Sequence, residues 1–142
     1  MGAVTIKKEV EPMQMVEISS KNIDGVIREG KTYLYFTAGF SPFAAAMEPV
    51  YQKFLAEAEQ YDVKVCRINV TDDIALGERF QIKELPTLLV FREGMKVHTV
   101  EGIVLPEYYT NLLKFYSANL QKPAARRAFF IEKRPGREKD GQ

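Results

Sequence analysis

The chain has 142 residues, of which 46% are apolar and 27% charged, and its net charge is +1. This composition fits one soluble domain with its own core. The single cysteine, Cys66, excludes an intrachain disulfide and a cysteine-based zinc cluster, and the single histidine, His98, excludes a multi-histidine metal site. No apolar run approaches the roughly 20 residues of a membrane helix and no secretory signal is visible, so we expect a cytoplasmic protein without membrane contact.

The first elements of the chain predict strands alternating with helices. After an extended lead-in over residues 1–13, weak alternation at residues 15–18 predicts a short strand. Ser19 and Ser20 can cap a helix over about residues 21–28, which Gly30 ends. Residues 33–36 form a continuous apolar run of β-formers, which predicts a strand buried on both faces and therefore central in a sheet.

A longer helix is predicted to begin at Ser41. A serine followed by a proline supplies an N-cap hydroxyl and a first helical residue that needs no N–H. We expect this helix to run to about residue 61 and to be kinked at Pro49. Its apolar stripe is predicted from spacings of three and four residues: Met47, Val50, Phe54 and Ala58.

The remaining elements complete an α/β pattern. Residues 63–70 alternate, with Cys66 and Ile68 on one face and Val63, Val65 and Arg67 on the other. A capped helix, a doubly buried strand, a hairpin turn, a returning strand and a closing helix are then predicted over residues 71–80, 87–91, 92–95, 96–100 and 105–118. In the closing helix Tyr108, Leu112 and Tyr116 lie four apart. Strands alternating with helices and ending in a hairpin predict a layered fold with a mixed sheet.

Several landmark residues accompany these elements: the helix proline Pro49, the strand-end Asn69, the Leu-Pro-Thr loop at 85–87, the hairpin Gly94 and Gly102. Over roughly residues 14–120, these elements and landmarks resemble the thioredoxin family. The resemblance implies the α/β thioredoxin fold, with a central mixed sheet of four to five strands flanked by helices, and a cis peptide bond before Pro86.

The family's redox chemistry does not carry over to this chain. Where thioredoxins have Trp-Cys-Gly-Pro-Cys, residues 40–44 read Phe-Ser-Pro-Phe-Ala, so Ser41 and Ala44 replace the two cysteines. The family's buried aspartate falls at Tyr35. Disulfide exchange needs a thiolate at the helix start and a second thiol to resolve the mixed disulfide. We therefore expect a redox-inactive protein that is not an enzyme and holds no cofactor or metal.

The resemblance leaves a groove as the candidate functional site. In thioredoxins the helix start, the cis-proline loop and the glycine before the last helix grip an extended peptide. Clustered exposed apolar groups also mark interaction surfaces in general. We therefore expect an adaptor, assembly factor or complex subunit that binds a protein or peptide, although Phe43 and Ile103 could instead pack against the chain's own ends. The predicted groove residues are Phe40, Ser41, Pro42, Phe43, Leu85, Pro86, Thr87, Gly102 and Ile103.

The end of the sequence supports a second hypothesis. Residues 122–142 carry seven basic and three acidic side chains, and residues 121–142 are expected to be a flexible basic tail. Such a tail could recruit RNA or a ribonucleoprotein, while the apolar triplet at 129–131 could dock on the body or on a partner. The candidate contact residues are Arg126, Arg127, Phe129, Phe130, Lys133 and Arg134.

Three further groups have a chemical and a structural interpretation. Cys66 could carry residual thiol chemistry, but its strand position favours a small buried core residue. Ser41 could be a nucleophile, but His98 is predicted on the edge strand, away from the helix start. Asp72 and Asp73 could be an acid pair, yet a helix N-terminus favours aspartate as a cap.

Overall fold

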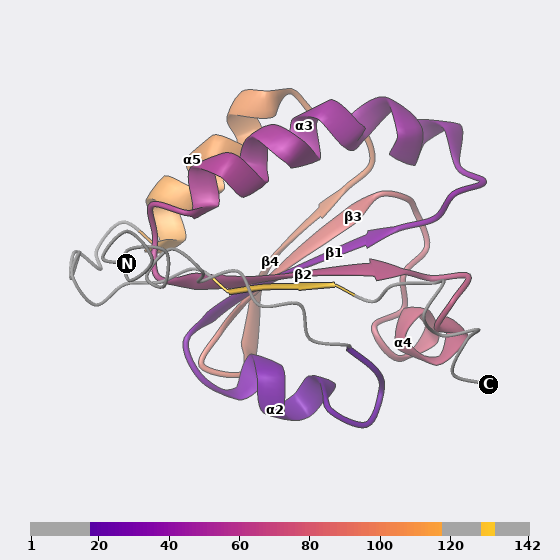
Figure 1. Ribbon diagram of the computed structural model, residues 1–142, viewed down its shortest axis with the longest axis horizontal. Coiled ribbons are helices and arrows are strands. Elements are labelled where there is room, and N and C mark those ends of the chain that lie inside the picture. The colour runs from indigo at the N-terminus through magenta and orange to yellow at the C-terminus, as the bar shows by residue number, and fades with distance from the viewer. Residues whose placement is uncertain (1–17, 118–128, 133–142) are drawn as a thin grey trace, which may run out of the picture.

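A five-stranded mixed sheet forms the centre of the molecule (Figure 1). The computed structural model describes residues 18–117 and the backbone of residues 129–132. The strand order is β4-β3-β1-β2-β5, with β1, β2 and β5 parallel to one another and β3 antiparallel to both β1 and β4. The elements are α2 (Ile23–Arg28), β1 (Lys31–Thr37), α3 (Pro42–Ala58), β2 (Val63–Asn69), α4 (Ile74–Arg79), β3 (Thr87–Arg92), β4 (Met95–Glu101), α5 (Pro106–Ser117) and β5 (Phe129–Glu132).

Helices cover both faces of the sheet, and each face has its own apolar core. Figure 1 shows α3 and α5 on one side of the strands and α2 and α4 on the other. Alternating residues of β1 serve the two cores: Tyr33 and Tyr35 pack under α3 and α5, while Leu34 and Phe36 pack with the residues around α2 and α4. The expected central, doubly buried strand is therefore confirmed, because period-2 alternation sends apolar side chains both ways.

The predicted start of α3 is confirmed and its predicted end is too late. The Ser41 hydroxyl accepts a hydrogen bond from the Ala44 N–H at 3.1 Å, and Pro42 is the first helical residue. The helix ends at Ala58 instead of residue 61. Tyr51 belongs to the buried stripe, whereas Val50 is only partly buried, because Met47, Tyr51, Phe54 and Ala58 keep the 3.6-residue period more closely.

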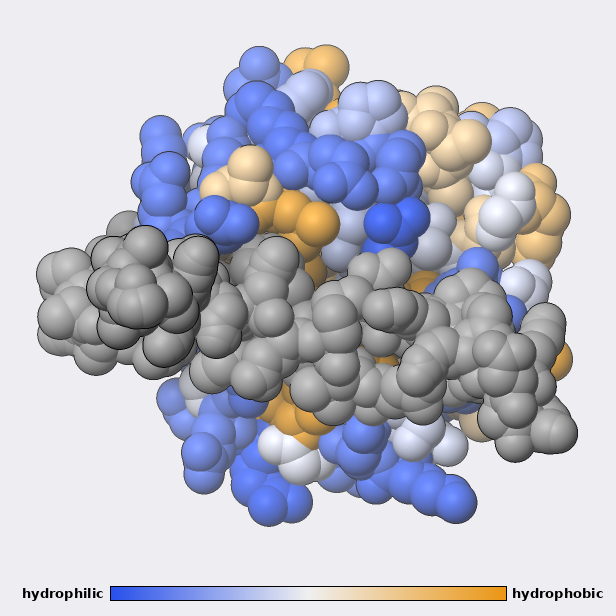
Figure 2. All heavy atoms as spheres, viewed as in Figure 1, coloured by the Kyte–Doolittle hydropathy of each residue, from blue (hydrophilic) through white to orange (hydrophobic). Residues whose placement is uncertain are grey.

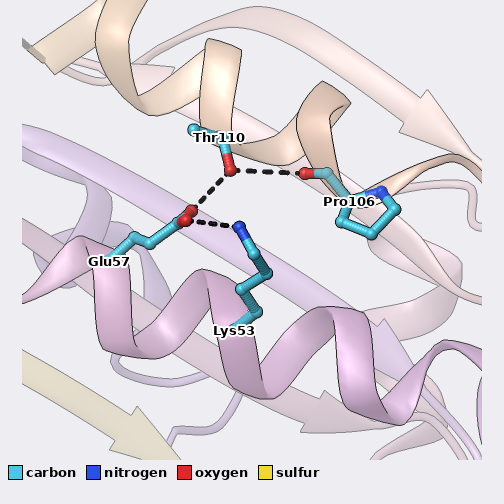
Figure 3. A network of polar contacts seen from close by, with 4 residues as sticks. All are labelled: Lys53, Glu57, Pro106 and Thr110. Carbon is cyan, nitrogen blue, oxygen red and sulfur yellow. Dashed lines mark hydrogen bonds and ion pairs between the residues drawn. The ribbon is translucent and has the colours of Figure 1, made fainter.

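A polar contact joins α3 to α5 at the outer edge of the helical layer (Figure 3). The Glu57 carboxylate accepts a hydrogen bond from the Thr110 hydroxyl and another from the Lys53 ammonium, both at 2.6 Å. The Thr110 hydroxyl also lies 3.4 Å from the Pro106 carbonyl. Beneath this contact the buried residues of α5 are Tyr109, Leu112, Leu113 and Ser117. Of the three residues that lie four apart in the sequence, Leu112 is buried, Tyr116 is partly buried and Tyr108 is exposed.

Near both ends of the chain, the described residues differ from the sequence predictions. Helix α2 begins at Ile23, two residues after the predicted start. Of the predicted strand at 15–18, only Ile18 is described; it is fully buried and lies outside any strand. Residues 129–132 form β5, which pairs in parallel with β2 from Lys64 to Arg67. The apolar triplet at 129–131 therefore lies on the body. No helix among the described residues is long and apolar enough to cross a membrane.

Candidate functional site

A groove lies at the end of the sheet where β1 and β2 finish. Figure 1 shows the start of α3 and the whole of α4 at this same end. The groove encloses about 960 Å³ and includes seven of the nine predicted groove residues. Its lining residues are Phe40, Ser41, Pro42, Phe43, Val70, Ile74, Gly77, Glu78, Gln81, Ile82, Lys83, Glu84, Leu85, Gly102 and Ile103. The other two predicted residues, Pro86 and Thr87, are buried next to Leu85.

Ser41 has a structural part in this groove. Its side chain caps α3 and the residue is only 6% exposed. The His98 ring lies on the edge strand β4, where its Nδ1 is 3.1 Å from the Tyr116 hydroxyl and its Nε2 is 3.4 Å from the Tyr108 hydroxyl. Both tyrosines belong to α5, so the structure pairs His98 with that helix and not with Ser41. A serine–histidine nucleophile is therefore not assembled here.

Hydrogen bonds hold two loops beside the groove, the cis-proline loop at residues 84–87 and the segment at Gly102 that follows β4. The Leu85–Pro86 peptide bond is cis. The Thr87 hydroxyl donates to the Glu84 carbonyl at 2.7 Å, and the Gly102 N–H donates to the Pro86 carbonyl at 2.8 Å. Gly102 has φ +80°, which side-chain-bearing residues rarely adopt, and a Cβ there would lie 3.5 Å from a carboxylate oxygen of Glu84. The Glu84 carboxylate therefore lies beside Gly102, where the two loops meet.

Exposed apolar side chains surround the groove. Their exposed fractions are 70% for Phe40, 59% for Phe43, 63% for Ile74 and 55% for Ile103. Figure 2 shows apolar residues, in orange and tan, gathered at the right-hand end of the molecule, where Figure 1 places the start of α3. Four such side chains beside one groove form an apolar surface of the kind that partners cover.

Sequence reasoning missed the wall that α4 contributes. Ile74, Gly77 and Glu78 line the groove together with residues 81–84. Asp73 caps α4 by accepting from the Leu76 N–H at 3.2 Å, as the sequence predicted, and this fixes the helix beside the groove. Gly77 lies close against Val70, since a Cβ at Gly77 would come within 3.3 Å of that side chain. The one signal in the sequence was Ile74, an apolar residue directly after the predicted cap.

Comparison with known proteins decides the family. The Thioredoxin family model matches residues 14–115. The chain belongs to the thioredoxin family. It is 29% identical to the thioredoxin of Chlamydia pneumoniae over 96 residues, and this match covers 68% of this chain and 92% of that protein.

Solved thioredoxin structures share the fold. A mutant thioredoxin from Halobacterium salinarum NRC-1 superposes with a TM-score of 0.61 at 25% identity, over 74% of this chain and 90% of that one. The oxidized mitochondrial thioredoxin 3 of Saccharomyces cerevisiae gives 0.62 at 16% identity, over 71% and 94%. The predicted thioredoxin fold is therefore confirmed.

The one thiol of this thioredoxin-family chain lies in the interior and not at the helix start. Cys66 is fully buried in β2, and its side chain belongs to the core that includes α2 and α4 residues. Burial raises the pKa of the Cys66 thiol to about 12, and the nearby Lys64 charge only partly opposes that shift. A thiol in this state is neutral at physiological pH and does not act as a nucleophile.

Tyr35, which stands at the position of the family's buried aspartate, is also uncharged at neutral pH. Tyr35 stacks on Tyr51 with ring centroids 4.1 Å apart, and Tyr109 meets it edge-on at 6.4 Å. The Arg67 guanidinium lies 4.8 Å from the centre of the Tyr51 ring and 2.9 Å from the Glu48 carboxylate. Burial raises the pKa of Tyr35 far above its usual range. Its hydroxyl has no hydrogen-bond partner within the described residues.

All the basic residues predicted to contact partners through the tail lie outside the described residues. They are Arg126, Arg127, Lys133 and Arg134. The backbone of residues 129 and 130 pairs with β2 opposite Lys64 and Val65. RNA recruitment by the tail therefore stays a prediction from sequence.

Proposed function

We propose that this chain is a redox-inactive, non-enzymatic member of the thioredoxin family that binds an extended segment of a partner protein in the groove at the start of α3. It would act as an adaptor, assembly factor or complex subunit. A reducing compartment such as the cytoplasm stays a prediction from the sequence. The observation that carries the proposal is the exposure of Phe40, Phe43, Ile74 and Ile103 around a groove whose helix start has no thiol.

The energetics of apolar burial support reversible binding. Full burial of a phenylalanine or isoleucine side chain contributes about 1.5–3 kcal/mol. Because the four side chains are already partly buried, a partner that covers them all would gain less than about 6–12 kcal/mol, and the cost of association must also be subtracted. Because Ser41 and Ala44 cannot form a mixed disulfide, nothing in the groove would trap the partner covalently.

The loops beside the groove support binding of an extended chain. Hydrogen bonds from Thr87 to Glu84 and from Gly102 to Pro86 hold both loops in place before a partner arrives. A preformed site avoids the entropy cost of ordering loops on binding. The groove is open at the surface, bounded by α3 on one side and α4 on the other, which suits a strand-like segment.

Selection from a library of random decapeptides displayed on phage tests this proposal. The wild-type chain should enrich peptides rich in large apolar residues. Phe43→Asp should reduce their affinity about ten-fold or more, because burial of one phenylalanine side chain contributes at least about 1.4 kcal/mol to binding. Phe115→Asp is the matched control, because Phe115 is 77% exposed on α5 and does not line the groove. No enrichment by wild type, or equal binding by the Phe43 variant, would overturn the proposal.

A further inference from the structure

Charged side chains also line the groove. Besides its apolar wall, the groove is lined by Glu78 from α4 and by Lys83 and Glu84 from the loop before β3. The ion pairs of the described residues are Lys53–Glu57, Arg67–Glu48 and Arg79–Asp24, so neither groove glutamate takes part in one. The groove therefore presents two carboxylates and one ammonium, with an excess of negative charge.

Building on the proposed function, we propose that the groove prefers a segment that carries a lysine or arginine beside its large apolar side chains, with Glu84 and Glu78 as the acceptors of that charge. The position of Glu84 carries most of this inference. Its carboxylate lies beside Gly102, the residue before Ile103, and Glu84, Gly102 and Ile103 all line the groove. A peptide that covers Ile103 therefore passes close to this carboxylate.

The physical basis is the cost of covering a charge that has no ion-pair partner. A neutral or acidic segment would take water away from Glu84 without supplying a partner, whereas a lysine or arginine would replace that water with a charge-assisted hydrogen bond. A partly enclosed apolar wall lowers the local dielectric constant and strengthens this pairing relative to a fully exposed one.

Lys83 opposes this preference and makes an internal control. It lies next to Glu84 in sequence and also lines the groove. Removing its charge with Lys83→Gln should increase binding of basic segments, while Glu84→Gln should decrease it. The two substitutions both place glutamine at neighbouring exposed positions, so a difference in sign reports the charge and not a general disturbance of the loop.

The same decapeptide library decides the question. Wild type should enrich peptides in which lysine and arginine exceed aspartate and glutamate next to the apolar positions, and the Glu78→Gln, Glu84→Gln double variant should lose this bias while still enriching apolar peptides. For one enriched peptide labelled with fluorescein, Glu84→Gln should weaken binding about two- to five-fold at low salt, and about 0.5 M sodium chloride should remove the difference.

The outcomes separate this inference from the proposed function. Apolar enrichment with no charge bias, or with an acidic bias, would overturn the role of the glutamates and leave the groove as a binding site. A basic bias that survives in the double variant would also overturn it. Absence of any enrichment, or enrichment unaffected by Phe43→Asp, would remove both proposals together.

Discussion

The groove at the start of α3 and the interior beneath it differ in what they hold at the places of the family's chemistry. The surface keeps an open, apolar groove with a capped helix start, but the cap is the hydroxyl of Ser41. The interior holds Tyr35 at the place of the buried aspartate, and it holds the only thiol in the fully buried Cys66. The surface resembles a binding site, while burial raises the pKa of both interior groups well above neutral pH.

This difference indicates that the groove of a thioredoxin fold can be kept without the residues of its redox chemistry. The groove depends on the Ser41 cap and on two backbone features, the cis bond before Pro86 and the positive φ of Gly102, and all of these are present. Redox chemistry depends on two thiols and a proton acceptor, which are side-chain properties. Loss of the second set leaves the first intact because the two sets share few residues.

The reactivity of thiols should show the strongest contrast between the groove and the interior. Cys66 should not react with the disulfide reagent DTNB at pH 7 in the native protein, because it is fully buried with its pKa raised to about 12. In the Ser41→Cys variant one thiol per chain should react at least about 10³-fold faster than the other, since a helix N-terminus lowers a thiol pKa. Absorbance of the released thionitrobenzoate follows both phases.

The wild-type chain supplies the control for this experiment. In guanidinium chloride it should release one equivalent of thiol, which shows that Cys66 is intact and only protected by the fold. Its rate of insulin reduction by dithiothreitol should equal the uncatalysed rate. Rapid native labelling of Cys66, or turnover that disappears in Cys66→Ala, would show that the interior retains redox chemistry.

The sequence predicts much of the fold because local patterns and landmark spacings agree. The doubly apolar run of β1 and the Ser41–Pro42 start of α3 were identified from residues alone. Helix ends were harder, since neither glycine nor proline follows Ala58 to mark the stop. On α5 the adjacent Tyr108 and Tyr109 are chemically identical, and only packing against Phe54 shows which one is buried.

Non-local contacts set the limit of prediction for both the fold and the site. The apolar triplet at 129–131 stands out from the charges around it, but strand β5 could not be predicted because its pairing depends on β2, more than 60 residues earlier. The α4 wall of the groove was missed for the same reason: Ile74 and Glu78 reach the groove only because the chain folds α4 beside the cis-proline loop. Landmark positions locate a site but do not give its outer wall.

A pair of tyrosines sharpens the description of the interior. The Tyr33 hydroxyl lies 2.7 Å from the buried Ser117 hydroxyl, so Tyr33→Phe should cost about 1–3 kcal/mol of unfolding free energy by leaving Ser117 without this partner. Tyr35 is equally buried in the same strand, but its hydroxyl has no partner among the described residues. Tyr35→Phe should therefore be neutral or stabilising by up to about 1 kcal/mol.

Urea unfolding of the two tyrosine variants measures this difference. The substitutions remove the same atom from the same strand, so each serves as the control for the other. Equal losses of stability would contradict the assignment of an unpartnered hydroxyl at Tyr35. A larger loss at Tyr35 than at Tyr33 would show that the interior beneath the groove still depends on a polar group at the family's aspartate position.

The smallest expected effect concerns Glu57, at the outer edge of the same helical layer. Partial burial raises the pKa of this carboxyl, but the hydrogen bonds from Lys53 and Thr110 outweigh burial and hold the pKa below its ordinary value of 4.5. A carboxyl with a depressed pKa in the folded state stabilises the fold above its unfolded pKa and loses that contribution on acidification. Glu57→Gln should therefore cost about 0.5 kcal/mol at pH 7 and almost nothing at pH 3. A cost for Glu57→Gln that is the same at both pH values would mean that the residue joins α3 to α5 by packing alone, and that charge matters only at the groove.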